Sequence, residues 1–322
     1  LPLLCHLSWA ASSLVEVRRV IAAGELDAVI GLTLTNSYCL ALQLRQADIP
    51  FVNVVLEPYH TMMPEHWVRP LARRVEQLAL RASDAVVVFT PQMRHYVCEM
   101  DAPPERVSTL QTGVSLDLFR PHVDGSIYRA ELGIGEGEWV LFFMGWLYGF
   151  SGLRQIVGRL VDEPDLLGYA RLLIVGDGDL YAELRRTVEQ ANMTERVILT
   201  GRRPYDQIPG LVAAGDVCLL PSEENDTTRD IVPMKVYEYL AAGKPVVACR
   251  LPGLLAEFGD SSGILYGDDP VDVVRRAVAL AGHSAEVKRL GAAGRRTAEE
   301  NADWEKTTER LEEILAAVAG VT

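Results

Sequence analysis

Short apolar runs alternate with helix-length segments along almost the whole of this 322-residue chain. The first half contains the runs DAVIGL (27–32), PFVNVVLE (50–57) and DAVVVFT (84–90). The second half contains WVLFFMG (139–145), ARLLIVGDG (170–178), RVILTG (196–201), DVCLLPS (216–222) and KPVVACR (244–250). Because strands joined by helices pair in parallel and are covered on both faces, this pattern predicts doubly wound α/β units.

The length of the chain and one polar stretch predict two domains. A chain of 322 residues exceeds what a single hydrophobic core usually supports, and residues 119–138 are rich in glycine and polar side chains, as linkers are. We expect an N-terminal Rossmann-like domain over 1–122, which lacks its first residues because the chain opens with Leu1 and no leading strand. We also expect a C-terminal domain over 135–303, followed by a helix over 304–322 that packs back on the N-terminal domain.

Composition excludes several classes of function. A net charge of −13 opposes a nucleic-acid-binding protein, since phosphates must be neutralised by excess Lys and Arg. The five cysteines are widely spaced in apolar contexts, which predicts free thiols in the cytoplasm, and no spacing of Cys and His suits a metal. No apolar run reaches the roughly 18 residues of a membrane span. An arginine-rich segment after Trp67 is predicted to form an ordinary surface helix. The alternative is a basic amphipathic helix that contacts the surface of a membrane.

The segment after the run 216–222 carries the most specific candidate residues: Asp230, Pro233, Lys235 and Glu238. The start of a helix favours an anion, so a diphosphate fits there with Lys235 as the counter-charge. Glu238 is placed to accept hydrogen bonds from the vicinal hydroxyls of a sugar. The alternatives are an exposed helix carboxylate at Glu238 and a capping or turn residue at Asp230.

Asp230 and Glu238 are separated by seven residues and followed by Gly243-Lys-Pro245-Val-Val, a pattern that resembles retaining glycosyltransferase family 4. The resemblance extends from residue 27 to residue 311 and implies the GT-B fold, in which two Rossmann-like doubly wound domains face a cleft. It places Asp230, where the family usually has Glu, near the hydroxyls of the donor sugar as a catalytic residue. It places Glu238 on the nucleotide ribose, with Pro233 in the expected frame.

The first strand of the second domain departs from the family pattern. In the family this strand ends in Gly-Arg, with Lys-Gly about five residues later, and the two cations bind the donor diphosphate. This chain has Gly145-Trp146 and then Ser151-Gly152. We expect Lys235, Arg154, Arg202 or Arg203 to supply the missing charge, the last two from the loop that binds the nucleotide base in the family.

His60 follows the predicted strand 50–57, at a point where similar enzymes carry a histidine that touches the donor sugar or its phosphate. The resemblance therefore implies that His60 is a second catalytic residue. The alternative is a histidine in a surface loop.

The resemblance implies transfer of a hexose from a UDP- or GDP-sugar to a hydroxyl, with retention of configuration. It implies no metal and no cofactor, since the nucleotide-diphosphate sugar is a substrate. The acceptor stays open between a glycan, a lipid carrier and a small molecule. The alternatives are a sugar-nucleotide epimerase of similar fold and, because Trp146 and Ser151 replace cations, a catalytically silent binding or regulatory protein.

Overall fold

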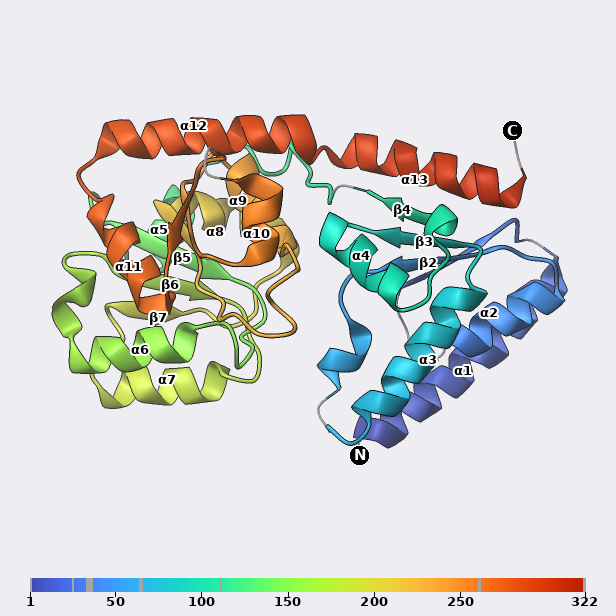
Figure 1. The fold of residues 1–322 in the computed structure, drawn as a ribbon. Coiled ribbons are helices and arrows are strands. Elements are labelled where there is room, and N and C mark those ends of the chain that lie inside the picture. The colour runs from blue at the N-terminus through green and yellow to red at the C-terminus, as the bar shows by residue number, and fades with distance from the viewer. Residues whose placement is uncertain are drawn as a thin grey trace. The chain divides into compact units, whose positions relative to one another are not determined.

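The computed structural model of the protein describes residues 2–24, 26–32, 37–63, 66–110, 112–259 and 262–320. The chain divides into two compact units (Figure 1). Unit 1 contains residues 1–111 and 305–322, and unit 2 contains residues 112–304. Each unit is built on one parallel sheet, with four strands in unit 1 and six in unit 2. Both units are therefore α/β domains.

In unit 1 the strand order is β1-β2-β3-β4. Its strands are β1 (Val29–Leu32), β2 (Phe51–Val55), β3 (Ala85–Val88) and β4 (Val107–Thr109). Its helices are α1 (Pro2–Ala23), α2 (Ser37–Gln46), η1 (Tyr59–Met62), α3 (Arg69–Ala82), α4 (Pro91–Glu99) and η2 (Pro104–Arg106), together with α13 (Trp304–Ala319), whose first residue belongs to unit 2.

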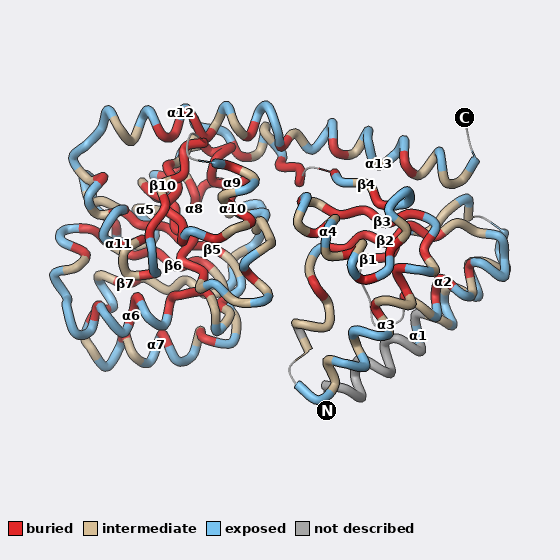
Figure 2. The backbone as a smooth tube through the Cα atoms, in the orientation of Figure 1, coloured by how far each residue is buried: buried red, intermediate tan, exposed pale blue. Residues whose placement is uncertain are grey.

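Strands β2 and β3 of unit 1 are buried along their whole length, between helices on the two faces of the sheet (Figure 2). Val52 and Val54 of β2 pack with Ile314 of α13 in one apolar cluster. Phe51 of the same strand packs with Leu44 of α2 in another. Since successive strand residues point to opposite faces and both faces are covered, β2 is apolar at every position except Asn53, which is buried as well.

In unit 2 the strand order is β10-β9-β8-β5-β6-β7. Its strands are β5 (Val140–Met144), β6 (Arg171–Val175), β7 (Val197–Leu199), β8 (Val217–Leu220), β9 (Val246–Cys249) and β10 (Ile264–Gly267). Its helices are α5 (Ser126–Glu131), α6 (Leu153–Asp162), η3 (Pro164–Leu167), α7 (Tyr181–Gln190), η4 (Tyr205–Gln207), α8 (Ile208–Ala214), α9 (Met234–Ala241), α10 (Pro252–Phe258), α11 (Pro270–Ala279) and α12 (Ser284–Asn301).

Strand β5 is the centre of unit 2. It pairs with β6 on one side and β8 on the other, and all five of its residues are buried. The chain runs from β5 to β6 and β7 on one side, then returns to place β8, β9 and β10 on the other. Such a reversal is the topological switch point at which doubly wound sheets bind ligands, outside the carboxyl ends of the strands.

Each apolar run that predicted a strand contains one, shorter than the run itself. The strands β4, of three residues, and β10, of four, were not among those predicted runs.

The predicted linker over 119–138 is wrong. The boundary between the units lies at Gln111 and Thr112, and the stretch contains α5. Phe119 and Ile134 are buried in the core of unit 2. These two apolar residues, isolated among glycines and polar residues, anchor the segment to that core.

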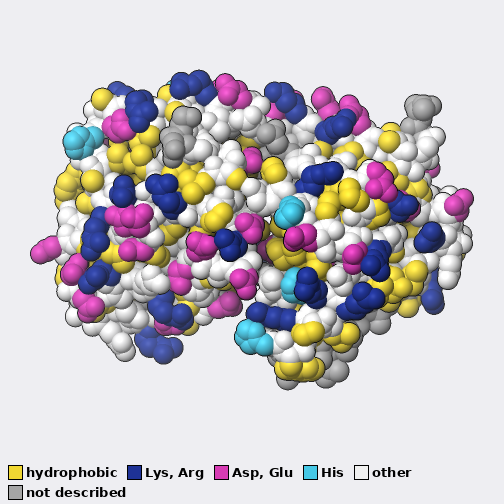
Figure 3. Space-filling model, in the orientation of Figure 1, with side chains coloured by type: hydrophobic (Ala, Val, Ile, Leu, Met, Phe, Trp, Pro, Cys, Tyr) yellow, Lys and Arg dark blue, Asp and Glu magenta, His cyan; other side chains and the backbone are white. Residues whose placement is uncertain are grey.

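The surface carries charges of both signs. On the face shown in Figure 3, Lys and Arg side chains are interspersed with Asp and Glu in each unit. None of the helices in the described part of the chain combines the length and the apolar character needed to cross a bilayer.

One buried hydrogen bond ties α9 to the end of β5. The Met144 N–H donates to the Tyr239 hydroxyl oxygen over 2.9 Å, and the Tyr239 ring meets Phe142 edge to face at 5.9 Å between centroids. Both residues of the hydrogen bond are at most 5% exposed. This bond fixes the height of α9 relative to the sheet.

Tyr239→Phe is expected to leave the Met144 N–H buried without an acceptor, which costs about 1–3 kcal/mol of unfolding free energy. Chemical denaturation of the intact chain measures this loss. The control is Tyr169→Phe, because Tyr169 is 63% exposed and its change is expected to stay within about 0.5 kcal/mol. Equal stability of the two variants would contradict the prediction.

Candidate active site

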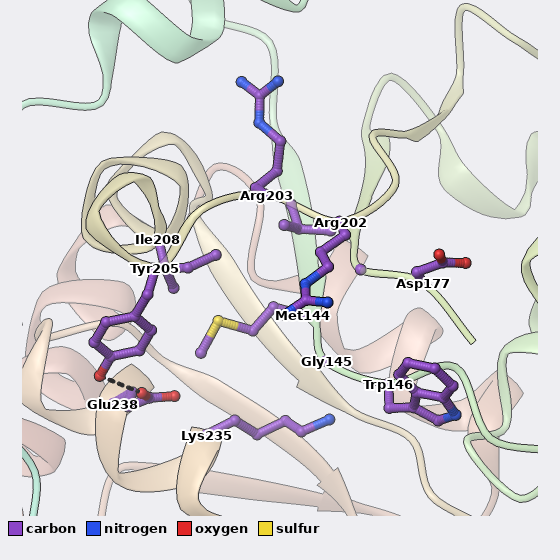
Figure 4. Close-up of a pocket in the computed structure, with 12 residues that line it drawn as sticks. Met144, Gly145, Trp146, Asp177, Arg202, Arg203, Tyr205, Ile208, Lys235 and Glu238 are labelled. Atoms are coloured by element: carbon purple, nitrogen blue, oxygen red, sulfur yellow. Dashed lines mark hydrogen bonds between the residues drawn. The ribbon is translucent and has the colours of Figure 1, made fainter.

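A cavity of about 390 Å³ lies at the carboxyl ends of β5, β6 and β7 in unit 2 (Figure 4). It is beside the switch point between β5 and β8, where the topology predicts a ligand. Its lining comes from the ends of β5 and β6 with the residues just after them, from the segment after β7 that leads through η4 into α8, and from the first turns of α9: Met144, Gly145, Trp146, Val175, Gly176, Asp177, Arg202, Arg203, Tyr205, Ile208, Lys235 and Glu238.

Two glycines let the ends of β5 and β6 approach each other. The Gly145 N–H donates to the Val175 carbonyl over 3.0 Å, and Gly145 and Gly176 have φ of +130° and +142°. A Cβ on Gly176 would lie 2.0 Å from the Gly145 carbonyl oxygen, and one on Gly145 would lie 2.6 Å from Lys235 Nζ. Both positions therefore exclude a side chain, and the Lys235 ammonium takes the space beside Gly145.

Lys235 brings a cation to the cavity from the first turn of α9. Its Nζ lies 4.4 Å from the centroid of the Phe143 ring, in a cation–π contact. Burial lowers the pKa of Lys235 to about 8, against the opposing pull of the Glu238 carboxylate. A cation held with so little hydration is poised to gain from an anionic ligand.

Glu238 lies one turn further along α9. The Tyr205 hydroxyl donates to Glu238 Oε1 over 3.2 Å, as the dashed line in Figure 4 marks. Burial raises the pKa of Glu238, and burial together with Glu238 raises the pKa of Tyr205 to about 12. The phenol stays protonated and holds one carboxylate oxygen, which leaves the other for a ligand.

The two arginines of the loop after β7 point in different directions (Figure 4). The Arg203 guanidinium is paired with Glu131 of α5 at 2.5 Å and extends away from Lys235 and Glu238. The Arg202 side chain is exposed and extends toward the end of β5. Of the two, Arg202 is the one placed to meet an anion in the cavity.

The two residues that replace the family's cations differ in position. Trp146 lines the cavity and is 51% exposed, in a loop where it lies beside Tyr148 with ring centroids 6.3 Å apart. Ser151 is 3% exposed, and its hydroxyl has no hydrogen-bond partner among the described residues. An aromatic face thus occupies the position of the first cation.

Asp230 and Pro233 do not line this cavity. The Asp230 carboxylate is 48% exposed and lies 3.9 Å from Arg229 Nε. It does not cap α9, because the residue at the N-cap is Pro233, in extended conformation with no side-chain hydrogen bond. The capping alternative for Asp230 is therefore wrong, and a turn residue or a sugar contact remains.

His60 lies in unit 1, in η1 after strand β2. Its imidazole is 18% exposed and is bonded to Glu76 and Tyr96. The imidazole is therefore held by two side chains, and its contact with a substrate stays a prediction.

Several lining residues lay outside the predicted set. Gly176 and Asp177 end the predicted strand 170–178, so their place at a strand end was the available signal. Tyr205 and Ile208 follow the two arginines, and nothing in their local sequence marks them. Among the described residues, no three His, Cys, Asp or Glu side chains gather as a metal site requires.

Two family models match the chain. A glycosyl transferase 4-like domain matches residues 3–113, and the glycosyl transferases group 1 model matches residues 139–283.

Curated relatives are glycosyltransferases of modest identity. The chain is 28% identical to 2-deoxystreptamine glucosyltransferase of Streptomyces kanamyceticus, over 59% of this chain and 49% of that protein. It is 28% identical to D-inositol 3-phosphate glycosyltransferase of Segniliparus rotundus, over 70% of this chain and 50% of that protein. The chain thus spans about half the length of these two relatives.

Solved structures share the fold. Anabaena HepE in complex with UDP and glucose superposes with a TM-score of 0.78 at 20% identity, over 93% of this chain and 80% of that one. Sucrose-phosphate synthase of Thermosynechococcus elongatus gives 0.75 at 21% identity, over 92% and 74%. With parallel sheets in both units and family models on both, the chain belongs to the group 1 glycosyl transferases of family 4 and has their GT-B fold.

Proposed function

We propose that this protein transfers a hexose from a UDP- or GDP-sugar to a hydroxyl acceptor with retention of configuration. The observation that carries the proposal is the pairing of Lys235 and Glu238 in one cavity at the switch point of unit 2. A nucleotide sugar offers a diphosphate and a ribose with vicinal hydroxyls, and these two side chains are complementary to those two groups.

In this proposal the donor diphosphate lies against Lys235 and Arg202. The partly buried ammonium at the end of β5 takes over the role of the two missing loop cations, and the start of α9 adds its positive dipole. Negative charge grows on the leaving diphosphate during transfer. Cations already held at that point lower the barrier more than they stabilise the ground state.

Glu238 is proposed to bind the ribose. A carboxylate can accept two hydrogen bonds from neighbouring hydroxyls, and Tyr205 holds Glu238 in one orientation. Pro233 sets where α9 begins, and Gly145 keeps the space beside Lys235 open. Asp230 and His60 are proposed to contact the transferred sugar, by the resemblance to the family.

The nature of donor and acceptor is proposed from the relatives. One relative of Mycobacterium tuberculosis is named GDP-mannose-dependent, and HepE is described with UDP-glucose. Others are named for transfer to 2-deoxystreptamine or to inositol 3-phosphate. We therefore propose a hydroxyl acceptor and a uridine or guanosine donor.

A second candidate is a protein that binds a nucleotide sugar without turning it over. The observation in its favour is Trp146 and Ser151 at the two positions of the family's phosphate-binding cations. Binding of a nucleotide sugar with no release of nucleoside diphosphate, with or without acceptors, would identify this second candidate.

Glu238→Ala is expected to weaken nucleotide binding by about 10- to 100-fold, since hydrogen bonds to a charged group contribute about 1.5–3 kcal/mol each. Calorimetry with UDP, GDP, ADP and their sugar conjugates measures the affinity, and wild type is expected to prefer one base. The matched control is Glu286→Ala, an α12 carboxylate paired only with Arg289 among the described residues. No binding of any nucleotide by wild type would refute the proposed function.

The affinity for a nucleoside diphosphate is expected to fall as pH rises from about 7 to about 9, since the lowered pKa of Lys235, about 8, lies in this window. Below this pKa the Lys235 amine is a cation that attracts the diphosphate, and above this pKa the amine is neutral. Lys235→Met is expected to bind weakly and without this pH dependence. Lys288→Met, on the exposed side of α12, is the control. An unchanged slope in Lys235→Met would show that another group titrates.

A further inference from the structure

The geometry around His60 points to a positioning role for two residues that no sequence pattern marked. We propose that Glu76 and Tyr96 hold the His60 imidazole with its Nδ1 protonated, so that Nε2 alone faces a substrate oxygen. The inference rests on the proposed function, in which that oxygen belongs to a hydroxyl or phosphate of the donor or acceptor.

The Glu76 carboxylate lies at the centre of the hydrogen bonds around His60. Its Oε2 accepts from the His60 backbone N–H over 3.2 Å and lies 3.0 Å from His60 Nδ1. Its Oε1 accepts from the Tyr96 hydroxyl over 2.7 Å and from the Tyr59 backbone N–H over 3.3 Å. The Tyr96 hydroxyl oxygen also lies 3.2 Å from His60 Nδ1. Three donors from η1 and α4 therefore converge on one carboxylate, and the imidazole nitrogen lies beside it.

These three donors bear on where the imidazole hydrogen lies. A carboxylate has about four acceptor positions, and an ionised carboxylate only accepts. Three positions of Glu76 are taken and His60 Nδ1 lies within hydrogen-bond distance of Oε2. In our proposal Nδ1 therefore carries the hydrogen that points at Glu76. The Nε2 nitrogen then accepts from a hydroxyl, or donates to an oxygen when the ring is protonated.

Burial distinguishes this cluster from an ordinary surface pair. The Glu76 side chain is 5% exposed, whereas that of His60 is 18% exposed. Burial, and then the Glu76 charge, raises the pKa of Tyr96, so its phenol stays a donor. Buried glutamates are rare unless they are paired.

The exposed pair on α4 provides the contrast. His95 Nε2 lies 3.2 Å from Glu99 Oε1, with the side chains 78% and 66% exposed. There the carboxylate meets the Nε2 edge in solvent, and no second hydrogen bond to the ring is seen among the described residues. Glu99→Gln is thus a matched control for Glu76→Gln.

The tautomer of His60 tests the inference directly. Long-range 1H–15N NMR of the intact wild-type protein, at a pH where the imidazole is neutral, is expected to show His60 with its hydrogen on Nδ1. His60→Gln assigns the signal. A hydrogen on Nε2 would overturn the inference, and this reading needs neither nucleotide nor turnover.

A double-mutant cycle tests whether Glu76 acts through His60. UDP release from UDP-glucose, or GDP release from GDP-mannose, is expected to fall by about 10- to 100-fold in Glu76→Gln, the range seen when a carboxylate that orients a metal-bound histidine is lost. In the His60→Ala background the same change is expected to have no further effect. Tyr96→Phe, which removes one of the donors to Glu76, is expected to lose less activity, and Glu99→Gln is expected to lose none.

An equal loss in the His60→Ala background would mean that Glu76 only supports the fold, and would overturn the inference. Unfolding midpoints of each variant separate lost positioning from lost stability. If wild-type protein binds no nucleotide at all, the proposed function fails, while the NMR result still decides the position of the hydrogen. The two failures are therefore distinguishable.

Discussion

The parallel pairing of β5 with both β6 and β8 is the constraint on which unit 2 depends. It buries β5 on both faces and both edges, so its five residues must all be apolar. It also forces the chain to reverse direction beside β5, which opens space only at the carboxyl ends of the strands. The candidate site follows from that reversal, because Met144, Gly145 and Trp146 are the residues with which the central strand ends.

The helix α9 converts this opening into a site with defined charges. Tyr239 binds the end of β5 through its hydroxyl, and the helix then presents Lys235 and Glu238 on the turns that face the cavity. One element therefore supplies both the cation and the carboxylate. Their separation is set by the pitch of a helix, which is stiffer than the loop in which the family carries its phosphate-binding cations.

The sequence predicted the parts of this arrangement that depend on local pattern. Apolar runs indicated every strand of the two sheets except β4 and β10, and the spacing around Lys235 and Glu238 indicated a helix with two candidate ligand-binding side chains. The linker was misplaced because Phe119 and Ile134 are isolated in a polar stretch, and only the folded chain shows that they are buried. The bonds of Tyr205 with Glu238 and of Glu76 with His60 join residues 33 and 16 positions apart, so no local pattern marks them.

The crowding of Lys235 against Gly145 and Phe143 has a consequence for the order of events at the site. An amine whose pKa lies near 8 is in part neutral in mildly alkaline solution, and an approaching diphosphate restores its charge. In the proposed function, donor binding at Lys235 draws protons from the solvent, and departure of the nucleoside diphosphate returns them. The heat of binding would accordingly vary with the ionisation enthalpy of the buffer. This dependence on the buffer would report proton uptake by Lys235 when the site is occupied.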